Sequence, residues 1–219
     1  MLVADLRYFL KEGVTVIIQN IIGPIISYCI GSIPFGFLIA KGVKGIDIRQ
    51  HGSGNPGATN VGRVVGRPYG IIVFILDMVK GFLPVFLFDR LVSGYGHNLL
   101  LILCGLGAIC GHTFPVFLRF KGGKAAATGC GVFLWLAPLS LFISAGVWVL
   151  TVALSRYISL GSMLASVSLV VCLITLSKDP FGNGLYLTLF SMFISVLLVV
   201  RHKTNIKRII NGTENKVGS

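Results

Sequence analysis

Charged residues are scarce in this sequence. They make up 12% of the 219 residues, whereas hydrophobic residues make up 54%, which leaves too little charge to cover the surface of a soluble domain. Several apolar stretches approach or exceed the roughly 20 residues that a helix needs to cross a bilayer. We therefore expect an all-helical integral membrane protein with a single membrane domain over residues 1–219.

Patterns that bind metals or form disulfides are also missing. None of the five cysteines belongs to a C-x-x-C pair, and all lie in or at the ends of apolar stretches, so we interpret them as small packing residues. Four histidines and few carboxylates provide no zinc or magnesium site. The sequence thus predicts no metal and no other cofactor.

Three common catalytic motifs are absent. No histidine has an aspartate five positions later, so the H-x4-D pair of the common glycerolipid acyltransferases is missing. There is no G-x-S-x-G elbow, which argues against serine hydrolase chemistry. The segment ending in Gly123-Lys124 is not a Walker A loop, because Leu118 stands at the first glycine position and Ala125 follows the lysine.

What is present is a chain of apolar spans separated by polar loops. Pro138 should divide the long apolar stretch 125–155 into two helices, because a proline inside a helix removes a hydrogen bond; one long kinked span is the alternative. We expect a leader at 1–15, seven spans at about 16–40, 69–88, 99–117, 125–137, 139–155, 158–176 and 185–200, and a cytoplasmic tail at 201–219.

Seven spans place the termini on opposite sides of the membrane, and the basic residues indicate which side is which. One side holds Arg7, Lys11, Arg90 and Lys178. The other holds fourteen basic residues: Lys41, Lys44, Arg49, Arg63, Arg67, Arg119, Lys121, Lys124, Arg156, Arg201, Lys203, Lys207, Arg208 and Lys216. The positive-inside rule therefore predicts an external N-terminus and a cytoplasmic C-terminus. The net charge of +12 fits this orientation and anionic substrates better than nucleic acid, which we do not expect as a partner.

The most polar stretch, residues 52–60, reads G-S-G-N-P-G-A-T-N. Its glycines permit positive φ or a close approach to a ligand, and successive backbone N–H groups in such a turn can hold an anion. Arg49 and Arg63 flank it. We interpret it as a phosphate cradle, with a Gly/Asn-rich turn as the alternative; the candidate binding residues are Ser53, Gly54, Asn55, Gly57, Thr59 and Asn60.

A second polar stretch, residues 111–124, reads G-H-T-F-P-V-F-L-R-F-K-G-G-K. Lys121 and Lys124 bracket two glycines, so two ammonium groups and bare backbone lie together. This composition predicts phosphate binding, and two lysines that only set the membrane topology are the alternative.

Two histidines and their neighbours are candidates for chemistry. His112 could be a general base, but we favour a polar residue satisfied at a helix end. His202 and Asn205 lie at i and i+3 and share a helical face with Arg208. This face could hold an anion, and a basic cap at the lipid headgroups is the alternative.

Other polar residues lie within or at the start of spans. The segment 159–162, which ends in Ser162, lies at the start of the span 158–176. Hydroxyl and N–H groups at a helix start can bind an anion, although an ordinary N-cap serine is favoured when the segment is taken alone. Asp77 and Lys80 lie inside a span at i and i+3. Because charges at that depth are usually paired, we interpret them as a structural ion pair more readily than as a proton path.

Together these stretches closely resemble the bacterial acyl-phosphate:glycerol-3-phosphate acyltransferases, the PlsY family. Any one motif is weak, but the ordered set spans about residues 28–214 and is highly specific. The matches are G-S-I-P-F-G at 31–36, D-I-R at 47–49, G-S-G-N-P-G-A-T-N-V at 52–61, D-M-V-K-G at 77–81, the whole stretch 111–124, S-L-G-S at 159–162, and R-H-K-T-N-I-K-R at 201–208 with Gly212 and Glu214. One departure is Ala-Ala-Ala after Lys124, where the family commonly has Gly-Val-Ala.

The resemblance implies transfer of a fatty acyl group from acyl phosphate to the sn-1 hydroxyl of glycerol 3-phosphate, giving lysophosphatidic acid and phosphate in phospholipid biosynthesis. It implies seven spans in the bacterial inner membrane, a site facing the cytoplasm, and an upstream enzyme that forms acyl phosphate as a partner. By motif position, the two phosphates and the reacting carbonyl would be held by Ser53, Arg63, Lys124, Ser162, His202 and Asn205.

The residues fit this chemistry independently. An acyl phosphate has a good leaving group, so the site mainly needs anion cradles, orientation and a donor for the developing oxyanion. The base is left open between His112, His202 and a substrate phosphate. The rival function is a transporter of a phosphorylated metabolite, but a transporter should bind near the bilayer midplane in repeated, broken helices, and no internal repeat is visible.

Overall fold

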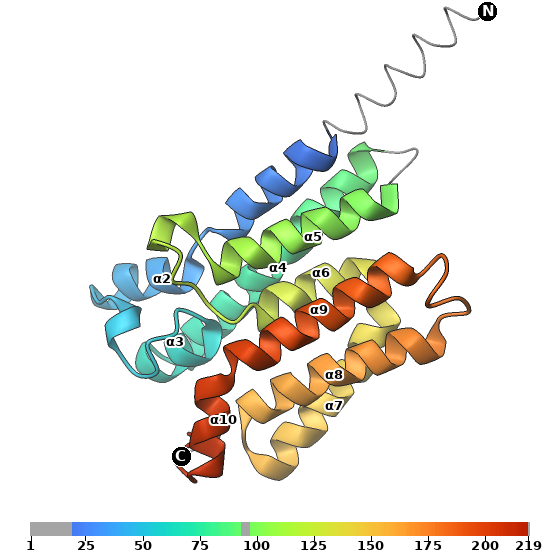
Figure 1. Ribbon diagram of the computed structural model, residues 1–219. Helices are drawn as coiled ribbons and strands as arrows, with labels where there is room; N and C mark the ends of the chain where they lie inside the picture. The colour runs from blue at the N-terminus through green and yellow to red at the C-terminus, as the bar shows by residue number, and fades with distance from the viewer. Residues whose placement is uncertain (1–18, 93–96, 219) are drawn as a thin grey trace, which may run out of the picture.

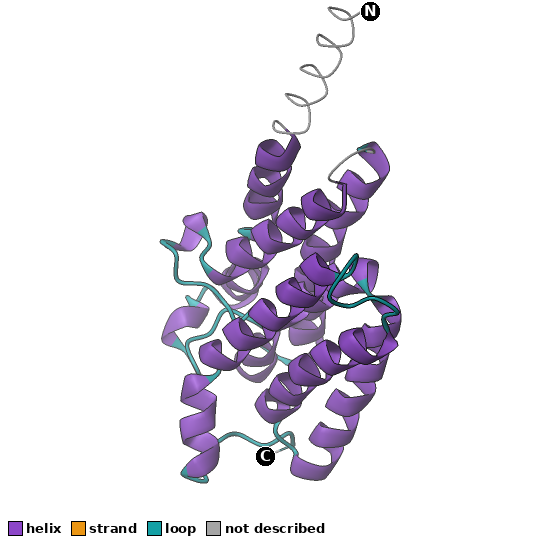
Figure 2. Cartoon of the chain, turned by 45° about the vertical axis from the view of Figure 1, so that its right-hand side comes forward, coloured by secondary structure: helices purple, strands orange, loops and turns teal. Residues whose placement is uncertain are grey.

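The long apolar runs of the sequence form helices, because backbone groups in lipid must find their partners within the protein. The computed structural model describes residues 19–92 and 97–218, and that part of the chain contains helices and loops but no strand (Figure 2). The prediction of an all-helical protein is confirmed. The chain is helical over 19–31 and continues through α2 (Phe35–Lys44), η1 (Ile48–Gln50), α3 (Ala58–Val64), α4 (Arg67–Leu91), α5 (His97–Thr113), η2 (Val116–Leu118), α6 (Ala126–Leu136), α7 (Pro138–Ser155), α8 (Ile158–Leu176), α9 (Leu185–Arg201) and α10 (Lys203–Ile210).

Five of these helical segments are long and apolar enough to cross a membrane: 19–44, α4, residues 97–118, α7 and α8. The 17-residue α9 joins this set only together with α10, from which it is bent by 54°. The 11 residues of α6 extend about 16 Å, roughly half the thickness of the hydrocarbon core. Length and composition therefore give five or six spans, where the sequence predicted seven.

Prolines set two of the breaks between helices. Residues 32–34 interrupt the first apolar segment before α2 begins at Phe35. The apolar stretch 125–155 forms two helices, with Ala137 between them and Pro138 as the first residue of α7. Proline is tolerated at that position because the first helical N–H groups have no partner within the helix.

Glycines bring α4 and α6 into backbone contact. A Cβ atom on Gly81 would lie 2.1 Å from the carbonyl oxygen of Thr128, and one on Gly131 would lie 1.9 Å from that of Met78. Only glycine fits at such a crossing, and close backbone approach is a common way to hold helices together in lipid. This contact places the start of α6, and the loop before it, against the middle of α4.

Apolar side chains fill the interior and also cover the outside. The core includes Val85, Leu100, Val132, Phe133 and Phe190. Large apolar side chains are also exposed on the outer faces of α4, α7, α8 and α9, among them Ile71, Phe142, Leu154, Val171 and Val196. A surface of this kind is compatible with a lipid environment and would be unusual for a soluble domain.

The polar segments gather at one end of the bundle. In Figure 1, α2 and α3 lie at the left and α10 at the lower left, and α6, α8 and α9 each have one end toward this side. The α8–α9 loop lies at the opposite end. This arrangement brings the two polar stretches of the sequence and the segment after α9 into one region.

Candidate active site

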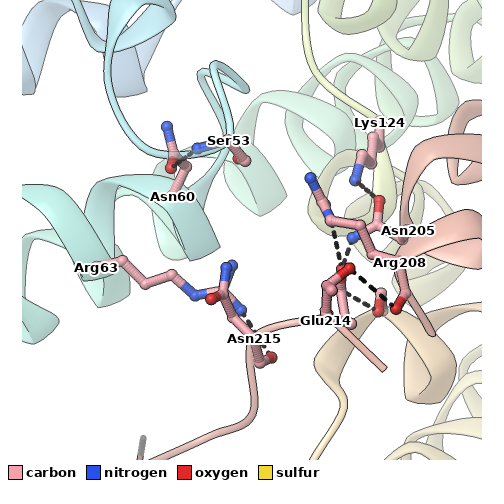
Figure 3. A network of polar contacts seen from close by, with 10 residues as sticks. Ser53, Asn60, Arg63, Lys124, Asn205, Arg208, Glu214 and Asn215 are labelled. Carbon is pink, nitrogen blue, oxygen red and sulfur yellow. Dashed lines mark hydrogen bonds and ion pairs between the residues drawn. The ribbon is translucent and has the colours of Figure 1, made fainter. Parts of the chain in front are cut away.

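A network of polar side chains links the second polar stretch to α10 (Figure 3). The ammonium of Lys124 donates a hydrogen bond to Oδ1 of Asn205. Nδ2 of Asn205 donates to Oε1 of Glu214 at 2.6 Å, and the hydroxyl of Ser159 donates to the same oxygen at 2.8 Å. Arg208 Nε donates to the other carboxylate oxygen at 2.7 Å. The Glu214 carboxylate thereby orients the amide of Asn205 so that its oxygen accepts the hydrogen bond from Lys124.

The bend between α9 and α10 places Asn205 in this network. The chain turns by 54° between α9 and α10, and Asn205 and Arg208 of α10 point toward Lys124 and Glu214 (Figure 3). His202 is buried, and its Nδ1 lies 2.8 Å from the carbonyl oxygen of Leu198. Because a carbonyl only accepts hydrogen bonds, we assign the proton to Nδ1, which leaves Nε2 of the neutral ring as an acceptor.

Backbone hydrogen bonds hold the segment before Lys124. The N–H groups of Gly122 and Gly123 donate to the carbonyl oxygens of Thr113 and His112, at 3.2 and 3.1 Å. Arg201 donates to the carbonyl oxygens of both glycines, at 3.2 and 3.1 Å. These two N–H groups are therefore occupied, so a phosphate bound by this segment would contact its lysine side chains and not these glycine N–H groups.

The electrostatics of the site are dominated by cations. Burial, together with the charges of Arg208, Arg201 and Arg63, lowers the pKa of Lys124 from its ordinary 10.5 to about 8, and Glu214 opposes this shift. Burial alone would raise the pKa of Glu214, but hydrogen bonds, the strongest from Arg208, lower it. Lys124, Arg63 and Arg208 thus interact with one ionised carboxylate, and Arg201 adds a further positive charge near the lysine. The excess positive charge suits an anionic ligand.

The first polar stretch is built around its own amides. Oδ1 of Asn60 accepts from the Ser53 N–H at 2.9 Å, and its Nδ2 donates to the His51 carbonyl at 2.9 Å. Oδ1 of Asn55 accepts from the N–H of Gly57 at 2.8 Å. These amides shape the loop, so their positions support the turn interpretation for Asn55 and Asn60 themselves.

The remaining groups of that loop are more accessible. Ser53 and Thr59 are exposed, and Gly54 has a φ of 71° that glycine adopts readily. Arg63, on α3, donates to the carbonyl oxygen of Asn215 at 3.4 Å (Figure 3). The residue after Glu214 therefore connects α3 with the network.

Besides the residues of the first polar stretch, four more predicted site residues lie outside the network. Arg49 forms an ion pair with Asp47 at 2.7 Å, and Lys121 is exposed. Ser162 donates to the Ile158 carbonyl of its own helix at 3.0 Å. His112 lies at the end of α5, 3.6 Å from the carboxylate of Asp77.

Sequence reasoning missed two members of the network, Ser159 and Glu214, as functional residues. Ser159, three positions before Ser162, is the serine of that motif that reaches the carboxylate. Glu214 is the one acidic residue of the basic segment 201–219, and its isolation among cations was the available signal. Within residues 19–92 and 97–218, no three His, Cys, Asp or Glu side chains gather as metal ligands would.

Comparison with known proteins connects this arrangement to a family. Residues 21–212 match a protein-family model described as glycerol-3-phosphate acyltransferase. The chain belongs to the glycerol-3-phosphate acyltransferase family. It is 48% identical over 192 residues to the glycerol-3-phosphate acyltransferase of Desulforamulus reducens, covering 88% of this chain and 92% of the relative. It is 45% identical over 203 residues to glycerol-3-phosphate acyltransferase 2 of Bacillus anthracis, covering 91% and 100%.

Solved structures agree with the assignment to this acyltransferase family. The crystal structure of PlsY (YgiH), an integral membrane glycerol 3-phosphate acyltransferase, is similar in its glycerol 3-phosphate form with a TM-score of 0.82 at 38% identity, covering 91% of this chain and 96% of that one. Its lysophosphatidic acid form gives a TM-score of 0.79. The family resemblance carried by the motifs is confirmed, and so is the integral membrane fold.

Proposed function

We propose that this acyltransferase takes its acyl group from acyl phosphate and transfers it to the sn-1 hydroxyl of glycerol 3-phosphate, giving lysophosphatidic acid and phosphate. The observation that carries the proposal is the set of cations around Lys124 and Asn205, because both substrates present a phosphate. Glycerol 3-phosphate and lysophosphatidic acid are named in the forms of the similar PlsY structure. The acyl phosphate donor is what the resemblance of the motifs to the PlsY family implies, and the chemistry of the site supports it.

Lys124 and Asn205 are the proposed centre of the reaction. The sn-1 hydroxyl oxygen attacks the carbonyl carbon of the acyl phosphate, and the new ester C–O bond forms as the bond from that carbon to the phosphate oxygen breaks. The departing phosphate keeps the electron pair, and Lys124 stabilises the growing negative charge. The hydroxyl proton passes to Nε2 of His202 or to the departing phosphate.

The surrounding residues would bind and orient the substrates. Arg63 and Arg208 supply guanidinium groups near the lysine, and the exposed hydroxyls of Ser53 and Thr59 can reach a phosphate entering from solution. Bidentate guanidinium contacts suit phosphate oxygens. The apolar outer surface of the helices supports delivery of the acyl chain from the bilayer.

The protein is proposed to lie in the bacterial cytoplasmic membrane with this site facing the cytoplasm. The basic residues of α2, α3, α10 and the loop 119–124 lie at the same end of the bundle as the site, which supports the positive-inside assignment. An enzyme that forms acyl phosphate would then supply the donor from the same compartment.

The test compares donors of equal chain length. Purified protein in detergent is given acyl phosphate, acyl-CoA or acyl carrier protein together with glycerol 3-phosphate, and lysophosphatidic acid and released phosphate are measured. We expect turnover with acyl phosphate only, since a thioester presents no phosphate at the carbonyl for the site to bind. Comparable turnover with acyl-CoA would overturn the assigned donor.

A further inference from the structure

A cluster of three buried ionisable side chains lies outside the network. Asp77 and Lys80 on α4 are 2% and 4% exposed, and His112 at the end of α5 is 8% exposed. Lys80 Nζ lies 2.8 Å from Oδ1 of Asp77, and His112 Nδ1 lies 3.6 Å from the same oxygen. Burying charges inside a helical bundle is costly, so the cluster calls for an explanation beyond packing.

The cluster reaches the break in the first apolar segment. Lys80 donates a hydrogen bond at 2.8 Å to the carbonyl oxygen of Ile33, which directly precedes Pro34. The ammonium also lies 5.6 Å from the centre of the Phe35 ring, within the range of a cation–π contact. Lys80 thereby connects α4 with the start of α2, close to the end of α5.

His112 also supports the segment that carries Lys124. Its carbonyl oxygen accepts the hydrogen bond from Gly123, and a Cβ atom on Gly123 would lie 2.1 Å from its Nε2. A Cβ atom on Gly122 would lie 2.2 Å from the His112 carbonyl oxygen. The two glycines thus lie directly against the histidine, and all three line one cavity with Ser32, Asp77 and Lys80.

We infer that Asp77, Lys80 and His112 are positioning residues for Lys124. The ion pair holds the imidazole at the end of α5, and the imidazole and its carbonyl hold Gly122 and Gly123. This arrangement places the ammonium of the next residue, Lys124, within hydrogen-bonding contact of Asn205. Because a misplacement of about 1 Å can cost about a hundredfold in rate, a distant cluster of this kind affects catalysis without touching substrate. The inference rests on the proposed function, in which Lys124 binds phosphate.

The test removes both charges together. Asp77→Asn alone leaves a buried ammonium without its partner and risks misfolding, whereas Asp77→Leu with Lys80→Met replaces the ion pair by apolar groups, which is often neutral or stabilising. We expect the melting temperature in detergent to be retained and kcat/KM for glycerol 3-phosphate to fall at least about tenfold. His112→Leu keeps the ion pair, removes only the ring, and should give the same kinetic loss.

A matched control breaks another Asp–His contact. Asp89 and His97 lie 2.9 Å apart near the other end of α4 and α5, away from the site. Asp89→Asn should leave kcat/KM unchanged. If it lowers kcat/KM as much as the cluster variants do, the effect is general and the positioning role is wrong.

A double-mutant cycle separates positioning from a merely structural role. In a Lys124→Ala background, the cluster variants should lower kcat/KM by no more than about twofold further, because their effect passes through the lysine. The inference is overturned if the fold-losses in kcat/KM of the cluster variant and of Lys124→Ala multiply in the combined variant. It is also overturned if a stable cluster variant has the kcat/KM of the wild type. Wild-type kinetics in Lys124→Ala itself would instead remove the lysine from the proposed site.

Discussion

Lys124 owes its properties to residues that lie far from it in the sequence. Burial and three arginines lower its pKa to about 8, so in the free protein its proton is lost near the upper end of the physiological pH range. The ammonium is the form that binds phosphate. The motif identified the residue, whereas this sensitivity to pH arises only from the packed structure.

We predict that kcat/KM for glycerol 3-phosphate falls as the pH rises through about 8. The pKa is lowered relative to a free lysine, so the charged form is present below about 8 and is lost above it. The substrate phosphate, with a second pKa of about 6, stays a dianion over this range. A pH–rate profile measures the fall.

Lys124→Arg is the control for this profile, because a guanidinium keeps its proton throughout. The variant should lose the decline above pH about 8, whatever its absolute rate. A decline of the same shape in Lys124→Arg would assign it to another group. Lys124→Ala should lower kcat/KM at least about tenfold at neutral pH, the loss expected for a charge-assisted hydrogen bond worth about 1.5–3 kcal/mol.

Ala125 occupies a backbone position that favours glycine. Its φ is 58° and its ψ 17°, in the left-handed region, where a residue with a Cβ atom pays about 1–2 kcal/mol. Ala125→Gly should therefore raise the melting temperature, with a net gain of up to about 1 kcal/mol after the loss of the buried methyl group.

Ala126→Gly provides the comparison for this substitution, because Ala126 is the first residue of α6 and has helical geometry. Glycine within a helix costs about 0.5–1 kcal/mol, so this variant should melt at a lower temperature than wild type. If both variants are destabilised, strain at Ala125 does not limit stability.

At the scale of the elements, the contact between α4 and α6 decides where the site lies. Gly131→Ala would place a methyl group 1.9 Å from the Met78 carbonyl oxygen and force the helices apart. We expect a loss of about 1–3 kcal/mol in stability together with reduced activity, measured by thermal unfolding and acyl transfer. Gly129→Ala on the same helix meets no atom within 4 Å, so it should keep activity and raise stability by about 0.5–1 kcal/mol, the usual gain from replacing a helical glycine.

The long helices could be predicted from the sequence, and the geometry of the site could not. Apolar runs and prolines locate α4, α7 and α8 within a few residues. The bend at His202 leaves no mark in the hydropathy pattern, yet it places Asn205. Asn60 was predicted to bind substrate because its amide can hydrogen-bond a ligand, but an amide can equally bond the backbone of its own loop. In the structure the Asn60 amide bonds the backbone of Ser53 and His51.

At the scale of the whole molecule, the orientation in the membrane is the main prediction. The sequence predicts seven spans with termini on opposite sides, which requires the short α6 and the bent α9–α10 pair to count as crossings beside the five long helices. Reporter fusions after residues 122 and 219 should report the cytoplasm, and fusions after residues 95 and 181 the outside. An external signal at residue 122 would contradict the orientation and the access of the site to soluble substrate.

Glu214 lies after the last apolar helix, yet it orients Asn205 and contacts Ser159 across 55 positions of sequence. A substitution there leaves every membrane helix in place, so insertion into the membrane does not report on it. Screens that score only whether the protein reaches the membrane would therefore miss damaging changes at this position. A measurement of lipid product would reveal them.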